Sequence, residues 1–150
     1  MEEFGERFVR ENIDVIDVGD MRVHQRLVIP QVGAGRTLSV TFERYSEEIG
    51  QAVCVSTAKG KLQIGEERAA RFILWADHSP VKVDLQITNR VPSDIVLWNA
   101  WRRHDGGVDA ALRYAGMLVE SVRTSVWHLR CSDGIGSADF DDLVLRVELR

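Results

Sequence analysis

The sequence has few cysteines, few prolines and no long apolar run. Its two cysteines, Cys54 and Cys131, lack the spacing of a disulfide framework or of a metal-binding motif. No stretch approaches the roughly 18 continuous apolar residues that a membrane helix needs, and the acidic N-terminus lacks the basic-then-apolar order of a signal peptide. We therefore expect a cytoplasmic protein with reduced cysteines and without a membrane partner.

A surplus of positive charge is missing as well. The 150 residues include 19 Lys or Arg and 23 Asp or Glu, which gives a formal net charge of −4. Nucleic-acid-binding proteins usually carry a basic surplus. The cluster Arg102-Arg103-His104 is followed at once by Asp105, so no basic run develops. This balance argues against a nucleic acid as a partner.

The motifs of common catalytic and zinc centres are also absent. The four histidines stand singly, whereas a zinc site usually shows at least one short-spaced pair of ligands. There is no G-x-S-x-G elbow for a hydrolase nucleophile. Carboxylate pairs for glycoside hydrolysis cannot be selected from 23 acidic residues without geometry. A hydrolase of unknown class stays open, but no motif favours an enzyme.

What the chain does contain is a succession of strand patterns. Apolar and polar residues alternate with period two in Thr37 to Tyr45, Val81 to Thr88 and Leu143 to Leu149, which is typical of strands with one buried face. Arg22 to Ile29 is a further predicted strand, ended by Pro30. About nine strands with short turns and no strand–helix alternation predict an all-β fold. We expect a single-domain antiparallel β-sandwich, jelly-roll-like, over residues 1–150.

Two segments admit a helix. Phe4 and Phe8 fall at helical spacing near the N-terminus, which fits a short amphipathic helix or a frayed arm. Asp109 to Val122 also shows a helical apolar face, although Gly116 would cost such a helix about 1 kcal/mol. The same region fits a loop followed by a hairpin around Arg123-Thr124-Ser125. We favour the loop and hairpin, because the rest of the chain is β.

The most distinctive stretch is the acidic segment before the last predicted strand. Asp133, Asp139, Asp141 and Asp142 place four carboxylates within ten residues. Like charges held this close repel one another unless protons, basic side chains or a cation offset them. Calcium takes about six to eight oxygen ligands, which these carboxylates and the carbonyls around Gly134 to Ser137 would supply. We predict a calcium-type site. The alternative is an exposed turn whose aspartates cap backbone N–H groups.

The motif DGIGSADFDDLVLRVEL resembles the aspartate-rich loop and last strand of certain bacterial calcium-binding β-sandwich modules. These modules include galactose-binding lectins of the soluble bacterial type. The resemblance is confined to about the last twenty residues, and Leu143-Val144 stands where those lectins have a small Ser-Gly pair. It implies calcium as cofactor, held by Asp133, Ser137, Asp141 and Asp142, with a sugar coordinated through the ion.

A second group of candidate residues surrounds Trp101, the second tryptophan of the pair Trp98 and Trp101. Aromatic faces stack on sugars and cations, and flanking polar groups can orient a ligand. The two tryptophans point to opposite faces of a strand, so we expect one in the core and the other near the end of the sheet. The predicted ligand-binding residues are Trp101, Asn99, His104 and Asp105. Core packing is the competing interpretation.

These patterns predict a non-catalytic binding module. Its calcium-type site in the loop Asp133–Asp142 would present a carbohydrate or another small polar ligand. The alternative is a protein–protein interaction or homo-oligomeric assembly protein without a metal, which would use its exposed strand edges and tryptophans.

Overall fold

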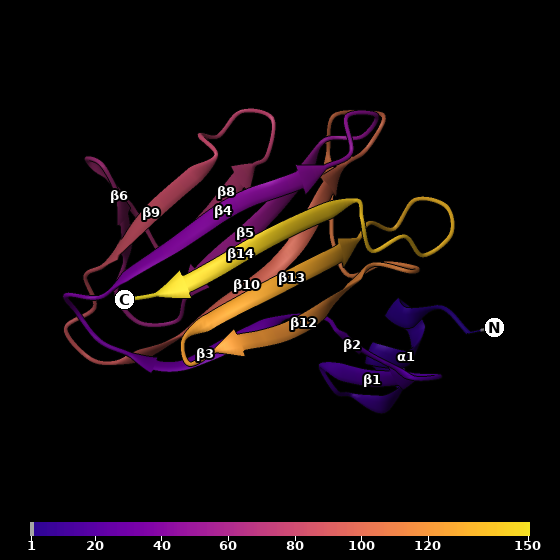
Figure 1. Cartoon of the computed structure of the whole chain (residues 1–150), viewed down its shortest axis with the longest axis horizontal. Helices are drawn as coiled ribbons and strands as arrows, with labels where there is room; N and C mark the ends of the chain where they lie inside the picture. The colour runs from indigo at the N-terminus through magenta and orange to yellow at the C-terminus, as the bar shows by residue number, and fades with distance from the viewer. Residues whose placement is uncertain (1) are drawn as a thin grey trace.

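In the computed structural model, which describes residues 2–150, two antiparallel sheets pack face to face (Figure 1). The larger sheet contains, in spatial order, β1 (Val15–Val18), β2 (Met21–His24), β12 (Gly116–Arg123), β13 (Val126–Ser132), β14 (Leu143–Leu149), β4 (Thr37–Tyr45), β9 (Lys82–Ile87), β6 (Leu62–Ile64) and β7 (Glu67–Ala69). The smaller sheet contains β8 (Arg71–Trp75), β5 (Gln51–Thr57) and β10 (Ser93–Arg102), with β3 (Leu27–Val32) and β11 (Val108–Asp109) also paired to β10. The predicted all-β antiparallel sandwich is confirmed.

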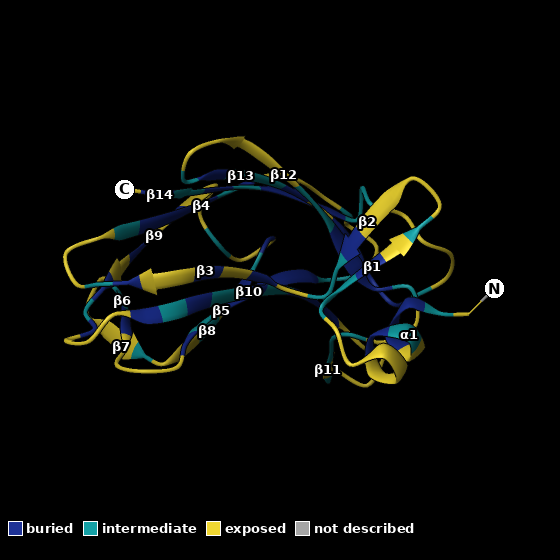
Figure 2. Cartoon of the chain, turned by 90° about the horizontal axis from the view of Figure 1, so that it is seen from below, coloured by how far each residue is buried: buried dark blue, intermediate teal, exposed yellow. Residues whose placement is uncertain are grey.

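The main core lies between the two sheets and follows from the alternation in the sequence. In the larger sheet Val147 of β14 pairs with Val40 of β4, and both side chains are fully buried. Leu97 of β10 faces them from the smaller sheet as part of the same apolar cluster. Full burial of such a side chain stabilises the fold by about 1.5–3 kcal/mol. The apolar residues of the period-two pattern therefore form one core between the two sheets (Figure 2).

A second, smaller apolar cluster holds the N-terminal helix. The helix α1 (Phe4–Glu11) buries Phe4 and Phe8 against Ile16 of β1 and Val23 of β2. Helical spacing puts both phenylalanines on one face, and of the two interpretations of this segment the short helix, not the frayed arm, is found. Within residues 2–150, no helix is long and apolar enough to cross a membrane.

The region Asp109 to Val122 is a loop followed by a hairpin, as the favoured interpretation predicted. Ala111 and Arg113 have positive φ values, which interrupt any helix there. Gly116 then starts β12 and lies against Val23, where a side chain would not fit. The hairpin β12–β13 places Leu129 of β13 in the main core.

Two details of the sequence-based prediction are wrong. The described part of the chain has 14 strands rather than about nine, because very short strands such as β7 and β11 show no clear alternation. Arg22 to Ile29 is also not one strand. The chain leaves β2 at His24 and enters β3 at Leu27, in the other sheet. Pro30 does not end β3 but lies within it, which an edge strand tolerates because no ladder N–H is needed there.

Candidate functional site

The predicted site residues lie at one end of the sandwich, which we call the loop end and define by residues 103–115 and 133–142. The acidic loop 133–142 connects β13 to β14 and projects at the right of Figure 1. Its two ends are held together because Cys131 pairs with Leu143. Phe140, near its C-terminal end, stacks on Phe4 with ring centroids 6.3 Å apart. The loop is therefore anchored to both the larger sheet and the helix.

Asp133 is the buried anchor of the acidic loop, with only 3% of its surface exposed. Its Oδ2 accepts a hydrogen bond from Gln51 Nε2 (2.8 Å), and its Oδ1 accepts one from the backbone N–H of Ile135 (2.9 Å). Gln51 begins β5, so this contact joins the loop to the smaller sheet. The Oε1 of Gln51 is buried and has no hydrogen-bond partner within residues 2–150. A donor or a cation at that oxygen would satisfy it.

Asp142 lies at the other end of the loop and is half-buried. Its Oδ2 accepts a hydrogen bond from the backbone N–H of Asp133 (3.0 Å). Burial raises the pKa of the Asp142 carboxyl to about 6, and the nearby charges of Asp133 and Asp139 act in the same direction. The hydrogen bond from Asp133 N opposes this shift. The carboxylate of Asp142 is therefore repelled by the charges of both Asp133 and Asp139.

Asp139 and Asp141 occupy more exposed positions. Asp139 Oδ1 accepts a hydrogen bond from the backbone N–H of Asp141 (3.0 Å). Asp141 Oδ1 accepts one from Arg130 Nη2 (2.8 Å), which holds the pKa of the Asp141 carboxyl below its usual range. Ser137 is exposed at the tip of the loop. Several of these bonds are the capping contacts of an acidic turn.

The five predicted metal ligands are thus only partly brought together. Asp133, Asp139 and Asp142 lie near one another, whereas Asp141 is paired with Arg130. As the loop stands, residues 2–150 contain no three His, Cys, Asp or Glu side chains grouped so that they could hold a metal ion. The donor atoms are all oxygens, which is the set that calcium prefers.

A groove of about 460 Å³ lies beside the acidic loop. Its lining residues are Trp101, Arg103, His104, Asp105, Asp109, Arg113 and Ile135. Three of the four predicted ligand-binding residues are among them. The fourth, Asn99, is buried and donates a hydrogen bond from Nδ2 to the backbone oxygen of Ser132 (2.8 Å), so it supports the loop from below.

The polar lining of the groove is held in place by a network around Arg103. Its Nε contacts Asp105 Oδ1 (3.1 Å) and its Nη1 contacts Asp109 Oδ1 (3.0 Å). The pKa of the Asp105 carboxyl is lowered first by the backbone N–H of Gly107 and then by Arg103. Arg113 Nη1 donates to the backbone oxygen of Gly134 (3.2 Å), which connects the groove to the acidic loop.

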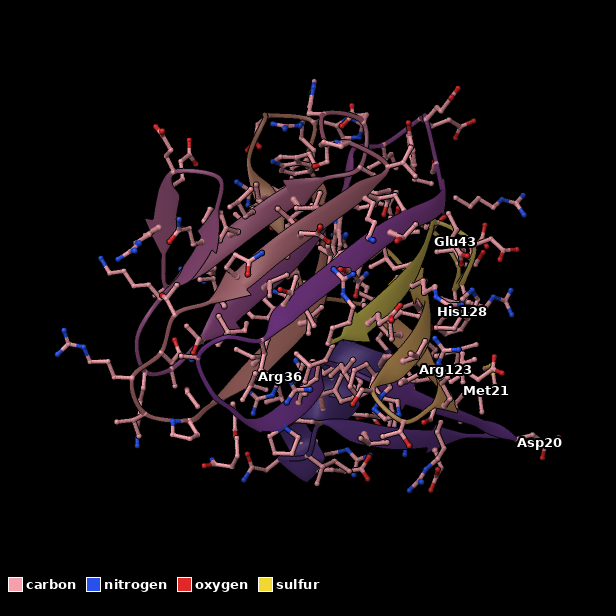
Figure 3. All side chains as sticks on the ribbon, turned by 60° about the vertical axis from the view of Figure 1, so that its left-hand side comes forward. Asp20, Met21, Arg36, Glu43, Arg123 and His128 are labelled. Carbon is pink, nitrogen blue, oxygen red and sulfur yellow. The ribbon has the colours of Figure 1, made fainter. Side chains whose placement is uncertain are left out.

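Trp101 forms the floor of this region rather than an exposed platform. Its side chain is fully buried, and Gly134 lies flat against the ring, where a Cβ would clash. Trp98 points to the other face of β10, as expected for a strand, and is partly exposed. His104 lines the groove, but His128 does not. His128 lies on the larger sheet against Glu43, with Nε2 2.9 Å from Oε1 (Figure 3).

Three residues that shape the loop end, Arg103 and Arg113 within it and Gln51 beneath it, were not identified from the sequence. Gln51 is polar at the start of an apolar strand, and its contact with Asp133 depends on how the two sheets pack. Arg103 and Arg113 are ordinary basic residues in the sequence, and only the fold brings them to one groove. The closeness of Arg103 to Asp105 in the sequence could have indicated their ion pair. Nothing in the sequence indicates that Arg113 contacts the backbone of Gly134.

In comparisons with protein-family models, with curated proteins and with solved structures, no match to this chain was found.

Proposed function

We propose that the protein is a non-catalytic binding module that holds a calcium-type cation on the acidic loop and a small polar ligand in the adjoining groove. One observation carries the proposal. Asp142 lies close enough to Asp133 and to Asp139 for their negative charges to repel its own, and none of the three forms an ion pair with a basic residue in the part of the chain described. A cation would remove this repulsion.

The chemistry of the loop supports a hard cation. Backbone N–H groups engage one carboxylate oxygen each of Asp139 and Asp142, and the second oxygen of each carboxylate is a suitable donor for calcium. The partnerless Oε1 of Gln51 is a further neutral oxygen next to Asp133. Calcium would supply positive charge here, while the protein residues position the ligands and anchor the loop.

The groove supports a polar organic ligand. Its guanidinium groups, Arg103 and Arg113, donate hydrogen bonds, and its carboxylates, Asp105 and Asp109, accept them. Hydroxyl groups of a carbohydrate both donate and accept, which suits such a lining. Because Arg113 is bonded to Gly134 O, a cation that stiffens the acidic loop would also fix one wall of the groove.

Thermal unfolding with calcium or with a chelator tests the cation. At neutral pH, calcium should raise the melting temperature through binding to the folded state. The shift should disappear in the double variant Asp139→Ala/Asp142→Asn. Asp20→Asn is the matched control, because Asp20 stands at the tip of the β1–β2 turn, away from the acidic loop (Figure 3). An unchanged melting temperature of the parent protein at millimolar calcium would refute the cation site.

A second candidate function is self-assembly through the outer face of the smaller sheet. Val28 and Ile73 are 40% and 44% exposed on β3 and β8, and Trp98 lies between them on β10. Apolar sheet faces of this kind are typical of interfaces. Sedimentation velocity should then show a dimer that is insensitive to calcium and that Ile73→Lys dissociates. A monomer at all accessible concentrations would exclude this alternative.

A further inference from the structure

A basic hollow of about 340 Å³ lies at the end of the sandwich opposite the loop end. Four basic residues line it, namely Lys59, Lys61, Arg68 and Arg90. They come from the β5–β6 connection, from β7 and from the β9–β10 connection. Figure 2 shows β6 and β7 at the left end and α1 at the right end. The fold thus brings together cations that are distributed over more than thirty residues of sequence.

The four charges have no anionic partner among the described residues. None of them forms an ion pair within residues 2–150, although acidic residues outnumber basic ones in the chain. Most other arginines do form one, including Arg26 with Asp14 and Arg130 with Asp141. Neighbouring like charges disfavour one another. A cluster of unpaired cations in a hollow is therefore a place where an anion would be stabilised.

Short polar contacts fix the backbone around the hollow. Thr88 Oγ1 donates a hydrogen bond to Lys61 O (2.6 Å), and Lys59 N donates one to Ser93 Oγ (3.1 Å). Gly60 has a φ of +85° and lies against the buried Asn89, where a Cβ would clash. Asn89 itself donates from Nδ2 to Thr57 Oγ1 (3.0 Å). The two connections that carry three of the cations are therefore locked to each other.

Arg68 is held by a neutral partner, so its charge stays uncompensated. Its Nε donates to Gln63 Oε1 (2.8 Å), and Gln63 Nε2 donates in turn to Gly65 O (2.7 Å). The carboxylates next in sequence, Glu66 and Glu67, form no ion pair with it among the described residues. A neutral amide that orients a guanidinium leaves its remaining N–H groups available for an anion.

We propose that the basic hollow binds the phosphoryl or sulfuryl group of a small molecule. A tetrahedral dianion matches the planar N–H fork of arginine and the point charges of lysine. The hollow has the volume of a small-molecule site, and the net charge of −4 opposes a long polyanion. This site is separate from the loop end and does not depend on the function proposed for it.

Amide NMR titration with inorganic phosphate at about pH 8 and constant ionic strength tests the site. Under these conditions phosphate is mostly a dianion. Saturable shifts are expected for the amides of residues 59–61 and 88–91, and sulfate should produce them as well. Shifts that stay linear with concentration, or that chloride reproduces at equal ionic strength, would overturn the proposal.

Variants identify the cations responsible. Lys61→Gln and Arg90→Gln should each weaken phosphate binding about tenfold, since each removes a charge-assisted hydrogen bond. Lys82→Gln is the matched control, because Lys82 is exposed at the far end of β9. Equal weakening in all three variants would mean a non-specific charge effect and would contradict a defined site.

The source of the anionic group is decided by competing ligands. A phosphate monoester such as glycerol 2-phosphate should bind at least as tightly as inorganic phosphate if the group belongs to a small organic molecule. Tighter binding of inorganic phosphate would assign the free ion as the ligand. Preference for a single-stranded oligonucleotide over both would overturn the small-molecule assignment.

Discussion

At the loop end the anchoring carboxylate, Asp133, is buried, whereas at the opposite end the basic side chains remain in solvent. Asp133 is buried and takes hydrogen bonds from Gln51 and from a backbone N–H. Lys61 and Arg90 are exposed and have no ion-pair partner among residues 2–150. Backbone amides can fix a short carboxylate in a way that they cannot fix a long cationic side chain. Charge at the loop end is therefore preorganised, and charge at the basic hollow is adaptable and more sensitive to salt.

The two ends share one structural element, a glycine pressed against a buried side chain. Gly134 lies against the ring of Trp101, and Gly60 lies against Asn89. In each case a Cβ would approach backbone atoms to about 2.9 Å, closer than real Cβ contacts allow. The two ends therefore differ in how their charged side chains are held. At both ends the backbone depends on the close packing of a glycine.

The largest expected effect tests how rigid the loop end is. Gly134→Ala should lower the free energy of unfolding by about 3 kcal/mol, because the new methyl group meets a fully buried tryptophan ring. Gly136→Ala is the control, since Gly136 has a positive φ but open space around its Cβ position. Urea denaturation should give a loss of about 1 kcal/mol for the control. Similar losses in both variants would show that the loop can move away from Trp101.

The second prediction tests whether Asp133 is the anchor among the acidic residues. Asp133→Ala should cost about 2–3 kcal/mol, because the N–H of Ile135 loses its acceptor and Gln51 Nε2 keeps only the longer bond to Ile49 O (3.3 Å). Asp139→Ala should cost much less, since that side chain is exposed. Chemical denaturation of both variants in the presence of chelator measures the contrast. A reversed order would mean that the loop is anchored elsewhere.

The third prediction concerns pH and the like charges of the loop. The pKa of Asp142 in the folded protein is raised to about 6 from its ordinary value of 3.8, so the protonated form is favoured by folding. The stabilisation from this group is fully present below about pH 4 and is lost as the pH rises through 6.

Asp142→Asn imitates the protonated carboxyl and should therefore gain stability relative to the parent protein as the pH rises from about 4 to 7.5. We expect a gain of about 1 kcal/mol, less than the full shift implies because the carboxyl is half exposed. Melting curves of both proteins across this range, without calcium, give the difference directly. A difference in melting temperature that does not change with pH would show that neither burial nor the acidic neighbours raise the pKa of Asp142.

The smallest effect is expected for the ion pair that the acidic loop forms through Asp141. Arg130→Gln removes the contact with Asp141 (2.8 Å), which lies in solvent. Exposed pairs contribute little to stability, so the melting temperature should change by less than about 2 °C. The calcium-dependent shift should persist in this variant. Loss of that shift would place Asp141 and Arg130 in the cation site itself.

Much of the fold was readable from the sequence, because alternation in segments such as Thr37 to Tyr45 reflects burial on one face of a strand. The break between β2 and β3 was not, since Gln25 and Arg26 carry no strong turn signal and their role depends on Asp14. The acidic loop was located correctly, and the alternative interpretation anticipated the bonds from backbone N–H groups to its aspartates, but the contact between Asp133 and Gln51 was not predictable. The basic hollow was missed because its residues lie in separate segments that only sheet packing brings together.

The position of β14 has a consequence for how the protein is made. This strand lies in the interior of the larger sheet, between β13 and β4, and Leu149 pairs with Leu38 more than a hundred residues earlier. During synthesis β4 must therefore wait with an open edge until residues 143–149 leave the ribosome. An open apolar edge is a template for aggregation, so a chain stopped before Leu143 should accumulate as insoluble material. Chaperone demand should be concentrated in that interval of translation.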